Sequence, residues 1–150
     1  TVLFLDEPTT GVDAVSRKEF WDMLTRLKEQ GITILVSTPY MDEAARCDRV
    51  ALIQNGQILS INTPEGVVNS FSKPLLAARA DDMLSLLEAL KSLPVVDNAY
   101  PSGIYHHVVM KPGTGLKELQ EGLQEQRIQH AEIMPAKVGI EDCFMELMKA

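Results

Sequence analysis

Short apolar runs alternate along the chain with stretches whose apolar side chains recur at helical spacing. Residues 2–5 are four consecutive apolar residues followed by two acids, the pattern of a strand that is buried on both faces. Residues 16–30 repeat apolar side chains at helical spacing, which predicts an amphipathic helix that Gly31 would end in a left-handed conformation. Ser16 begins a capping-box spacing, while Asp13 is equally able to cap an earlier start.

The next apolar run, at residues 32–37, is rich in β-branched side chains and predicts a second strand. A strand, a helix and a strand therefore follow one another in the order of a parallel crossover. Asn55-Gly56 is the pair of residues that best closes a two-residue hairpin. The further elements expected here are a short helix at 40–47, hairpin strands at 49–54 and 57–61, and a short helix that starts at Pro64.

The composition changes near residues 69–74, where Asn, Ser, Lys and Pro interrupt the pattern, and we expect a domain boundary there. The predicted domains are 1–71 and 72–150. In the second domain the pattern predicts a β-α-β-β-α-β order, which is the order of a small ferredoxin-like α+β domain, with one closing helix. The expected strands are 75–79, 95–100, 105–111 and 128–134, and the expected helices are 82–92, 116–126 and 140–148.

The composition narrows the class of protein. With 14 basic and 21 acidic residues the net charge is −7, so the chain offers no positive field that would attract nucleic acid. No apolar run is long enough to span a membrane. Cys47 and Cys143 lack the spacing of a zinc site and are expected to be reduced thiols in a cytoplasmic protein. Because the chain opens at Thr1 directly into an apolar strand, we expect it to be a fragment of a longer protein.

The chemistry is concentrated where the first strand ends. Residues 2–13 read VLFLDEPTTGVD, and phosphoryl transfer needs both a carboxylate that holds a metal and a residue that positions the attacking water. This string resembles the Walker B motif and D-loop of ABC transporter ATPases, a family of P-loop NTPases. The resemblance implies that Asp6 holds Mg²⁺ through a water and that Glu7 is the catalytic residue that orients the water. It also places Gly11 and Asp13 in the loop that meets the partner subunit at the ATP-binding dimer interface.

A second match covers the family's switch region. Residues 34–44 read ILVSTPYMDEA, which resembles that region except that Pro39 stands where the family has a histidine. Proline has neither a side-chain proton nor a backbone N–H to donate, so this position lacks the usual donor. The resemblance extends from Thr1 to Val68, which implies an α/β fold with part of a P-loop NTPase parallel sheet.

The second domain resembles an accessory domain of exporter ATPase subunits. The resemblance is carried by residues 139–147, which read GIEDCFMEL.

Other candidate sites are weaker. His106 and His107 are adjacent on an expected strand and must point to opposite faces, so they make a poor metal pair.

No phosphate-binding loop of the GxxxxGK[ST] type occurs in the sequence, so the segment alone is expected not to hydrolyse ATP. The resemblance implies that the parent is an ATP- and Mg²⁺-dependent ATPase that powers export. Its expected partners are a second ATPase subunit, in a head-to-tail dimer, and a transmembrane permease at the inner face of the cell membrane. The alternative is a regulatory or structural nucleotide-binding protein whose catalytic site has decayed, with Pro39 as the first sign.

Overall fold

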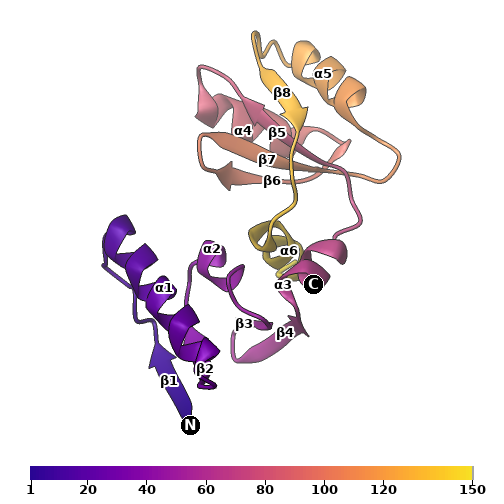
Figure 1. The fold of residues 1–150 in the computed structure, drawn as a ribbon. Coiled ribbons are helices and arrows are strands. Elements are labelled where there is room, and N and C mark those ends of the chain that lie inside the picture. Colours follow the sequence, from indigo (N-terminus) through magenta and orange to yellow (C-terminus); the bar gives the residue numbers. More distant parts are fainter. Residues whose placement is uncertain (150) are drawn as a thin grey trace. The chain divides into compact units, whose positions relative to one another are not determined.

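The computed structural model describes residues 1–149, which form a mixed α/β protein. These residues fall into two compact units, 1–67 and 68–149, which are described separately below (Figure 1). The division lies between Val67 and Val68, inside a short helix, whereas the domain boundary at 71/72 stays a prediction.

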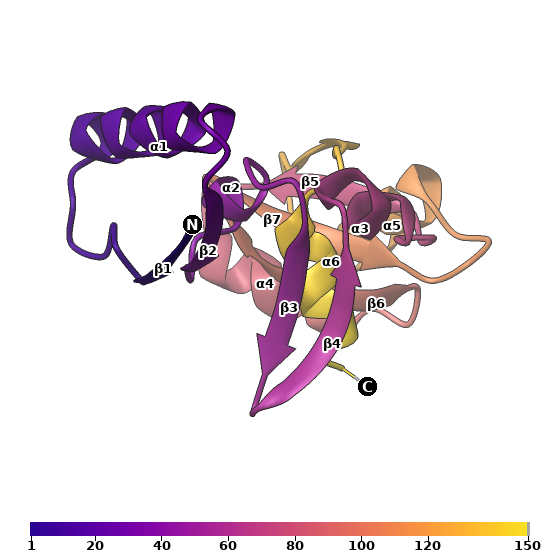
Figure 2. The same cartoon turned by 60° about the horizontal axis from the view of Figure 1, so that its bottom comes forward.

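The first unit begins with two parallel strands, β1 (Val2–Asp6) and β2 (Thr33–Ser37), which are joined by helix α1 (Ala14–Glu29). Helix α1 contacts β2, and Figure 2 shows this helix from the side. Its buried side chains are Trp21 and Leu24. The helix starts at Ala14 because the Asp13 carboxylate accepts hydrogen bonds from the backbone N–H groups of residues 15 and 16, both at 3.0 Å. Asp13, not Ser16, is therefore the cap.

A short helix and a hairpin complete this unit. Helix α2 (Met41–Ala44) is shorter than the predicted 40–47, because the chain after it continues in turns. Strands β3 (Val50–Gln54) and β4 (Gln57–Asn62) are antiparallel, and Asn55 and Gly56 both have positive φ, at 50° and 74°, as a tight hairpin turn requires. Helix α3 (Pro64–Asn69) then starts at the predicted proline.

The second unit is built on one antiparallel sheet with the strand order β6-β7-β5-β8. Its elements occur in the predicted order, and one further helix closes the chain. They are β5 (Leu75–Arg79), α4 (Met83–Ser92), β6 (Val96–Ser102), β7 (Tyr105–Met110), α5 (Leu116–Glu125), β8 (Glu132–Pro135) and α6 (Ile140–Leu147).

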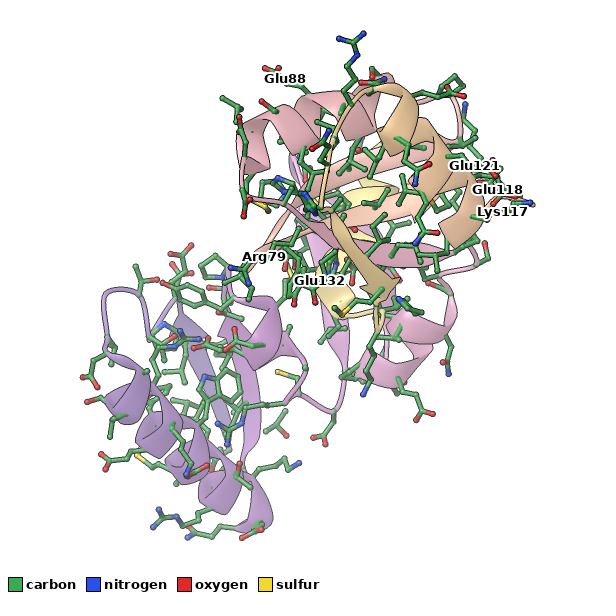
Figure 3. All side chains as sticks on the ribbon, turned by 90° about the horizontal axis from the view of Figure 1, so that it is seen from above. Arg79, Glu88, Lys117, Glu118, Glu121 and Glu132 are labelled. Carbon is green, nitrogen blue, oxygen red and sulfur yellow. The ribbon has the colours of Figure 1, made fainter. Side chains whose placement is uncertain are left out.

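Both faces of this sheet are covered. Alternate residues of β5, β6 and β7 pack with apolar residues of α4 and α5 in a core that includes the fully buried Leu86, Leu90 and Leu119. The opposite face holds a smaller cluster of Leu75, Tyr100 and Val109. The labelled charged side chains of α4 and α5 in Figure 3, Glu88, Lys117, Glu118 and Glu121, point away from the sheet, as a solvated helix face should.

The predicted strand 128–134 is wrong at its start, since β8 begins only at Glu132. Arg127 and His130 have φ of 60° and 57°, in the left-handed region, which is incompatible with a continuous strand. The apolar pattern misled the prediction because Ile128 and Ala131 do pack on the core, but from an irregular segment before the strand. None of the helices within residues 1–149 has the length and apolar character needed to cross a lipid bilayer.

Candidate functional site

The first unit brings Asp6 next to the end of the neighbouring strand. Asp6 is the last residue of β1 and lies in register with Ser37, the last residue of β2. The Ser37 hydroxyl donates a hydrogen bond to Asp6 Oδ1 and accepts one from the backbone N–H of Glu7 at 2.9 Å. These side chains are exposed, and Asp6 and Ser37 line a shallow hollow of about 240 Å³. Two acids and a hydroxyl are thus gathered at one carboxyl edge, where parallel sheets bind ligands.

Glu7 has a backbone conformation that separates its carboxylate from that of Asp6. Its φ is 43°, in the left-handed region that a residue with a side chain adopts only when its surroundings impose it. The N–H of Glu7 still bonds to the Ser37 carbonyl oxygen at 3.0 Å, so the turn is held to β2. Its carboxylate accepts a hydrogen bond from the Thr10 hydroxyl at 3.3 Å. Asp6 therefore ends the strand while Glu7 belongs to the turn, and the two acids can serve different roles.

The turn after Glu7 is closed by its own backbone. The N–H of Thr10 bonds to the Glu7 carbonyl oxygen at 3.2 Å, and the N–H of Val12 bonds to the Thr9 carbonyl oxygen at 3.1 Å. Gly11 has a φ of 77°, a conformation that favours glycine. Asp13 follows as the cap of α1, and hydrogen bonds from Ser16 lower the pKa of its carboxyl. Gly11 and Asp13 are both exposed, so they are accessible to a partner.

Pro39 is exposed at the switch position, and its neighbour Thr38 is already engaged. The Thr38 hydroxyl donates to Glu43 Oε2 at 2.6 Å and accepts from the backbone N–H of Tyr40 at 3.1 Å. A hydroxyl has one proton, so Thr38 has none left for a ligand in this arrangement. The ring of Tyr40 lies under the guanidinium of Arg17, 4.3 Å from its centroid.

Sequence reasoning missed four residues that support this site: Thr9, Arg17, Ser37 and Glu43. Ser37 could have been found, because parallel strands that end together place their last residues side by side. Glu43 gave no signal, since an acid in the first turn of a helix usually faces solvent. Its side chain is only 2% exposed. Burial alone raises the pKa of Glu43, but its hydrogen bonds, of which those from Thr38 and Thr9 contribute most, outweigh that effect and hold the pKa below its usual value.

The donor set at the strand end suits a hard cation. Within residues 1–149, no group of three or more His, Cys, Asp and Glu side chains is placed to hold a metal ion. Mg²⁺ does not need such a group, because it keeps several waters and takes one or two carboxylates together with phosphate oxygens. Asp6 offers a solvent-facing carboxylate with one oxygen bonded to Ser37, so its chemistry fits a residue that would help to hold Mg²⁺.

The histidine pair of β7 is divided between the two faces of the sheet, as predicted. His106 Nε2 lies 2.7 Å from the Met83 carbonyl oxygen, whereas His107 Nδ1 lies 2.6 Å from Asp142 Oδ1 on α6. Tyr100 also donates to Asp142 Oδ1, at 2.8 Å, and the pKa of Tyr100 is raised by burial and by this carboxylate. Tyr100 and His107 thus tie α6 to the sheet through Asp142.

The two cysteines differ in burial: Cys47 is half-buried and Cys143 is buried, and burial raises the pKa of Cys143 to about 11.

Comparison with known proteins gives matches to transporter ATP-binding proteins. A probable multidrug ABC transporter ATP-binding protein of Escherichia coli is 47% identical over 64 residues, which is 43% of this chain and 11% of that protein. The daunorubicin/doxorubicin resistance ATP-binding protein of Streptomyces peucetius is 40% identical over 93 residues, covering 61% of this chain and 28% of that protein. The doxorubicin resistance ATP-binding protein of Mycobacterium tuberculosis is 31% identical over 158 aligned residues, covering 97% of this chain and 46% of that protein.

The chain thus spans less than half the length of the curated relatives it matches. No protein-family profile matches it.

Proposed function

This chain is homologous to ATP-binding proteins of ABC transporters, and from that premise we propose that it is the carboxyl-terminal part of an ATPase subunit that powers export. The observation that carries the proposal is similarity to such a protein over 97% of the chain. The placement of Asp6 and Glu7 at the end of β1 supports it, because this is where the string resembling Walker B requires two acids.

In the proposed reaction the two acids have separate roles. Asp6 would hold Mg²⁺, which when bound would neutralise charge on the phosphates. Glu7 orients a water and accepts its proton as the water oxygen bonds to the γ-phosphorus and the bond from that phosphorus to ADP breaks. The Thr10 hydroxyl, 3.3 Å from Glu7 Oε2, and the left-handed turn hold Glu7 in position for this step.

The proposed assembly places two such subunits head to tail. Gly11 and Asp13 lie in the exposed turn that would meet the partner subunit, near the shared ATP. A separate transmembrane permease would carry the substrate, which would keep this subunit at the cytoplasmic face of the membrane. The first unit is then part of a P-loop NTPase sheet. For the second unit, the strand order β6-β7-β5-β8 supports a ferredoxin-like accessory domain.

A second candidate function is a nucleotide-binding regulator without turnover. Two observations favour it: Pro39 cannot donate a proton, and the hydroxyl of its neighbour Thr38 is used by Glu43. Both candidates bind ATP, so binding alone does not separate them. Turnover by the full-length subunit does, because a regulator would hydrolyse ATP no faster than its Glu7→Gln variant.

The test is Glu7→Gln in the full-length subunit that contains this sequence. The amide keeps the size of the side chain but cannot accept the water's proton, so we expect ATP turnover to fall by a factor of about 10² to 10⁴. ATP-dependent dimerisation should persist, as measured by size-exclusion chromatography with light scattering. Glu29→Gln, at the exposed end of α1, is the matched control and should leave both unchanged. Equal loss of binding and turnover in Glu7→Gln would remove Glu7 from this role.

A further inference from the structure

Glu43 is a buried carboxylate whose two oxygens bind different segments of the first unit. Oε1 accepts hydrogen bonds from the Thr9 hydroxyl at 2.6 Å and from Arg17 Nε at 3.0 Å. Oε2 accepts a hydrogen bond from the Thr38 hydroxyl at 2.6 Å. The Glu43 side chain is 2% exposed and Thr9 is 1% exposed, so water does not compete for these bonds.

This arrangement compensates for the burial of a charge. An isolated carboxylate would lose a large hydration free energy when it is buried, unless it is paired and hydrogen-bonded. Here the ion pair with Arg17 and two short hydroxyl bonds replace the lost water. Removal of any one donor would leave part of the charge uncompensated. The carboxylate therefore favours the one arrangement in which all three donors converge on it.

The segments that converge on Glu43 are the two that frame the proposed reaction. Thr9 lies in the turn that begins at Glu7, and Thr38 immediately precedes Pro39. We propose that Glu43 is a positioning residue that clamps the switch segment 37–40 onto the turn that carries Glu7. The inference rests on the proposed function for its effect on turnover, but the clamp itself is a property of the folded chain.

The chemistry of the side chain makes Glu43→Gln a sharp test. A carboxylate accepts at both ends, whereas an amide accepts at one end and donates at the other. Gln at this position can accept a hydrogen bond from Thr9 or from Thr38 but not from both, so the other hydroxyl would have to turn its proton away and accept from the NH₂ group instead. The size of the side chain stays almost the same, so the change removes the charge and one of the two hydroxyl-to-carboxylate bonds, which weakens the clamp and leaves the packing.

The matched control is Asp42→Asn. Asp42 is the adjacent carboxylate on α2 and also binds Arg17, at 3.0 Å, but its side chain is 76% exposed and contacts neither threonine. This variant loses a charge next to the same arginine without changing the clamp. We expect it to match the wild type.

In the full-length subunit, Glu43→Gln should lower the kcat for ATP hydrolysis by about 10- to 100-fold, because small displacements of catalytic groups cost this much. The dissociation constant for ATP should change by less than about threefold. Thr38→Val should reproduce the loss and Thr38→Ser, which keeps the hydroxyl, should restore most of the rate. Equal effects of Glu43→Gln and Asp42→Asn, or loss of affinity in step with kcat, would overturn the positioning role.

A second measurement needs no nucleotide. The N–H of Tyr40 donates to the Thr38 hydroxyl, so its hydrogen exchange should be at least about tenfold faster in Glu43→Gln than in Asp42→Asn. Unchanged exchange would contradict the clamp even if turnover fell. If the wild-type subunit neither binds nor hydrolyses ATP, the proposed function fails, and the exchange comparison still decides whether Glu43 joins the two segments.

Discussion

At the scale of single residues, the position of Pro39 bears on the rate of ATP hydrolysis that the proposed function implies. A preorganised donor that faces developing charge contributes on the order of 10² to 10³ in rate, and proline supplies none. The parent should therefore hydrolyse ATP slowly, and Pro39→His should increase kcat with little change in affinity for ATP. Steady-state turnover and equilibrium ATP binding by the full-length subunit check this.

The competing explanation is that a neighbouring hydroxyl replaces the missing donor. Thr38 is poorly suited, because its proton is bonded to Glu43. Tyr40 remains available to be tested, with its ring stacked under Arg17. A rate that is unchanged by Pro39→His but collapses in Tyr40→Phe would replace the slow-site interpretation with substitution by the tyrosine.

The site residues that can be predicted from sequence are those that belong to a contiguous sequence motif. Asp6 and Glu7 follow an apolar strand, and their strand-end position is visible in the pattern. Glu43 could not be predicted, because its burial depends on contacts with residues that lie 26 and 34 positions away. The sequence offers both Asp13 and Ser16 as the residue that caps the start of α1, and only the backbone geometry selects Asp13.

At the scale of elements, an ion cluster joins β6 and α6 to the segment before β5. Asp97 Oδ2 lies 2.7 Å from Lys149 Nζ and 2.8 Å from Lys73 Nζ, and Lys73 also pairs with Glu146. Hydrogen bonds from Lys149 and then Lys73 lower the pKa of Asp97 to about 2. In the folded chain the Asp97 carboxyl therefore binds a proton less readily than an ordinary aspartate, whose pKa is 3.8. Its stabilising effect is complete above that value and is lost as the pH falls towards 2.

We therefore expect Lys73→Met to lower the free energy of unfolding by about 1 kcal/mol at pH 7, as is typical for a partly exposed pair. The difference from the wild type should shrink as the pH is lowered from 4 to 2. Urea unfolding of the chain across this range checks it. Lys117→Met is the control, because Lys117 is exposed and lies 3.9 Å from Glu121. A difference that does not depend on pH would show that Lys73 acts only through packing.

Most elements of both units follow from the hydrophobic pattern, and the failures have local causes. The strands of the first unit and the helices of the second were predicted within a few residues, because apolar periodicity and turn residues agree there. Helix α2 and strand β8 are shorter than predicted. After α2 the chain continues in turns, whereas before β8 the apolar Ile128 and Ala131 pack on the core from an irregular segment.

At the scale of the whole molecule, the sequence pattern predicts that the residues from about Ser72 onward fold independently. The second unit holds a four-stranded sheet with an apolar cluster on each face, whereas the first unit holds two separate strand pairs. Brief digestion of the chain with a non-specific protease should cut first between residues 69 and 74. Trypsin is unsuitable, because Lys73 is followed by proline. A resistant 69–74 segment together with early cuts after Pro101 would contradict the boundary.

The strand pair β1–β2 bears on how the isolated chain behaves in solution. Val2, Phe4 and Leu35 are 54%, 71% and 61% exposed, so one face of this pair presents an apolar stripe to water. The net charge of −7 keeps copies of the chain apart through mutual repulsion, which added salt screens. Colloidal stability therefore depends on ionic strength. The chain is best kept dilute in low salt, and its scattering should rise as salt is added.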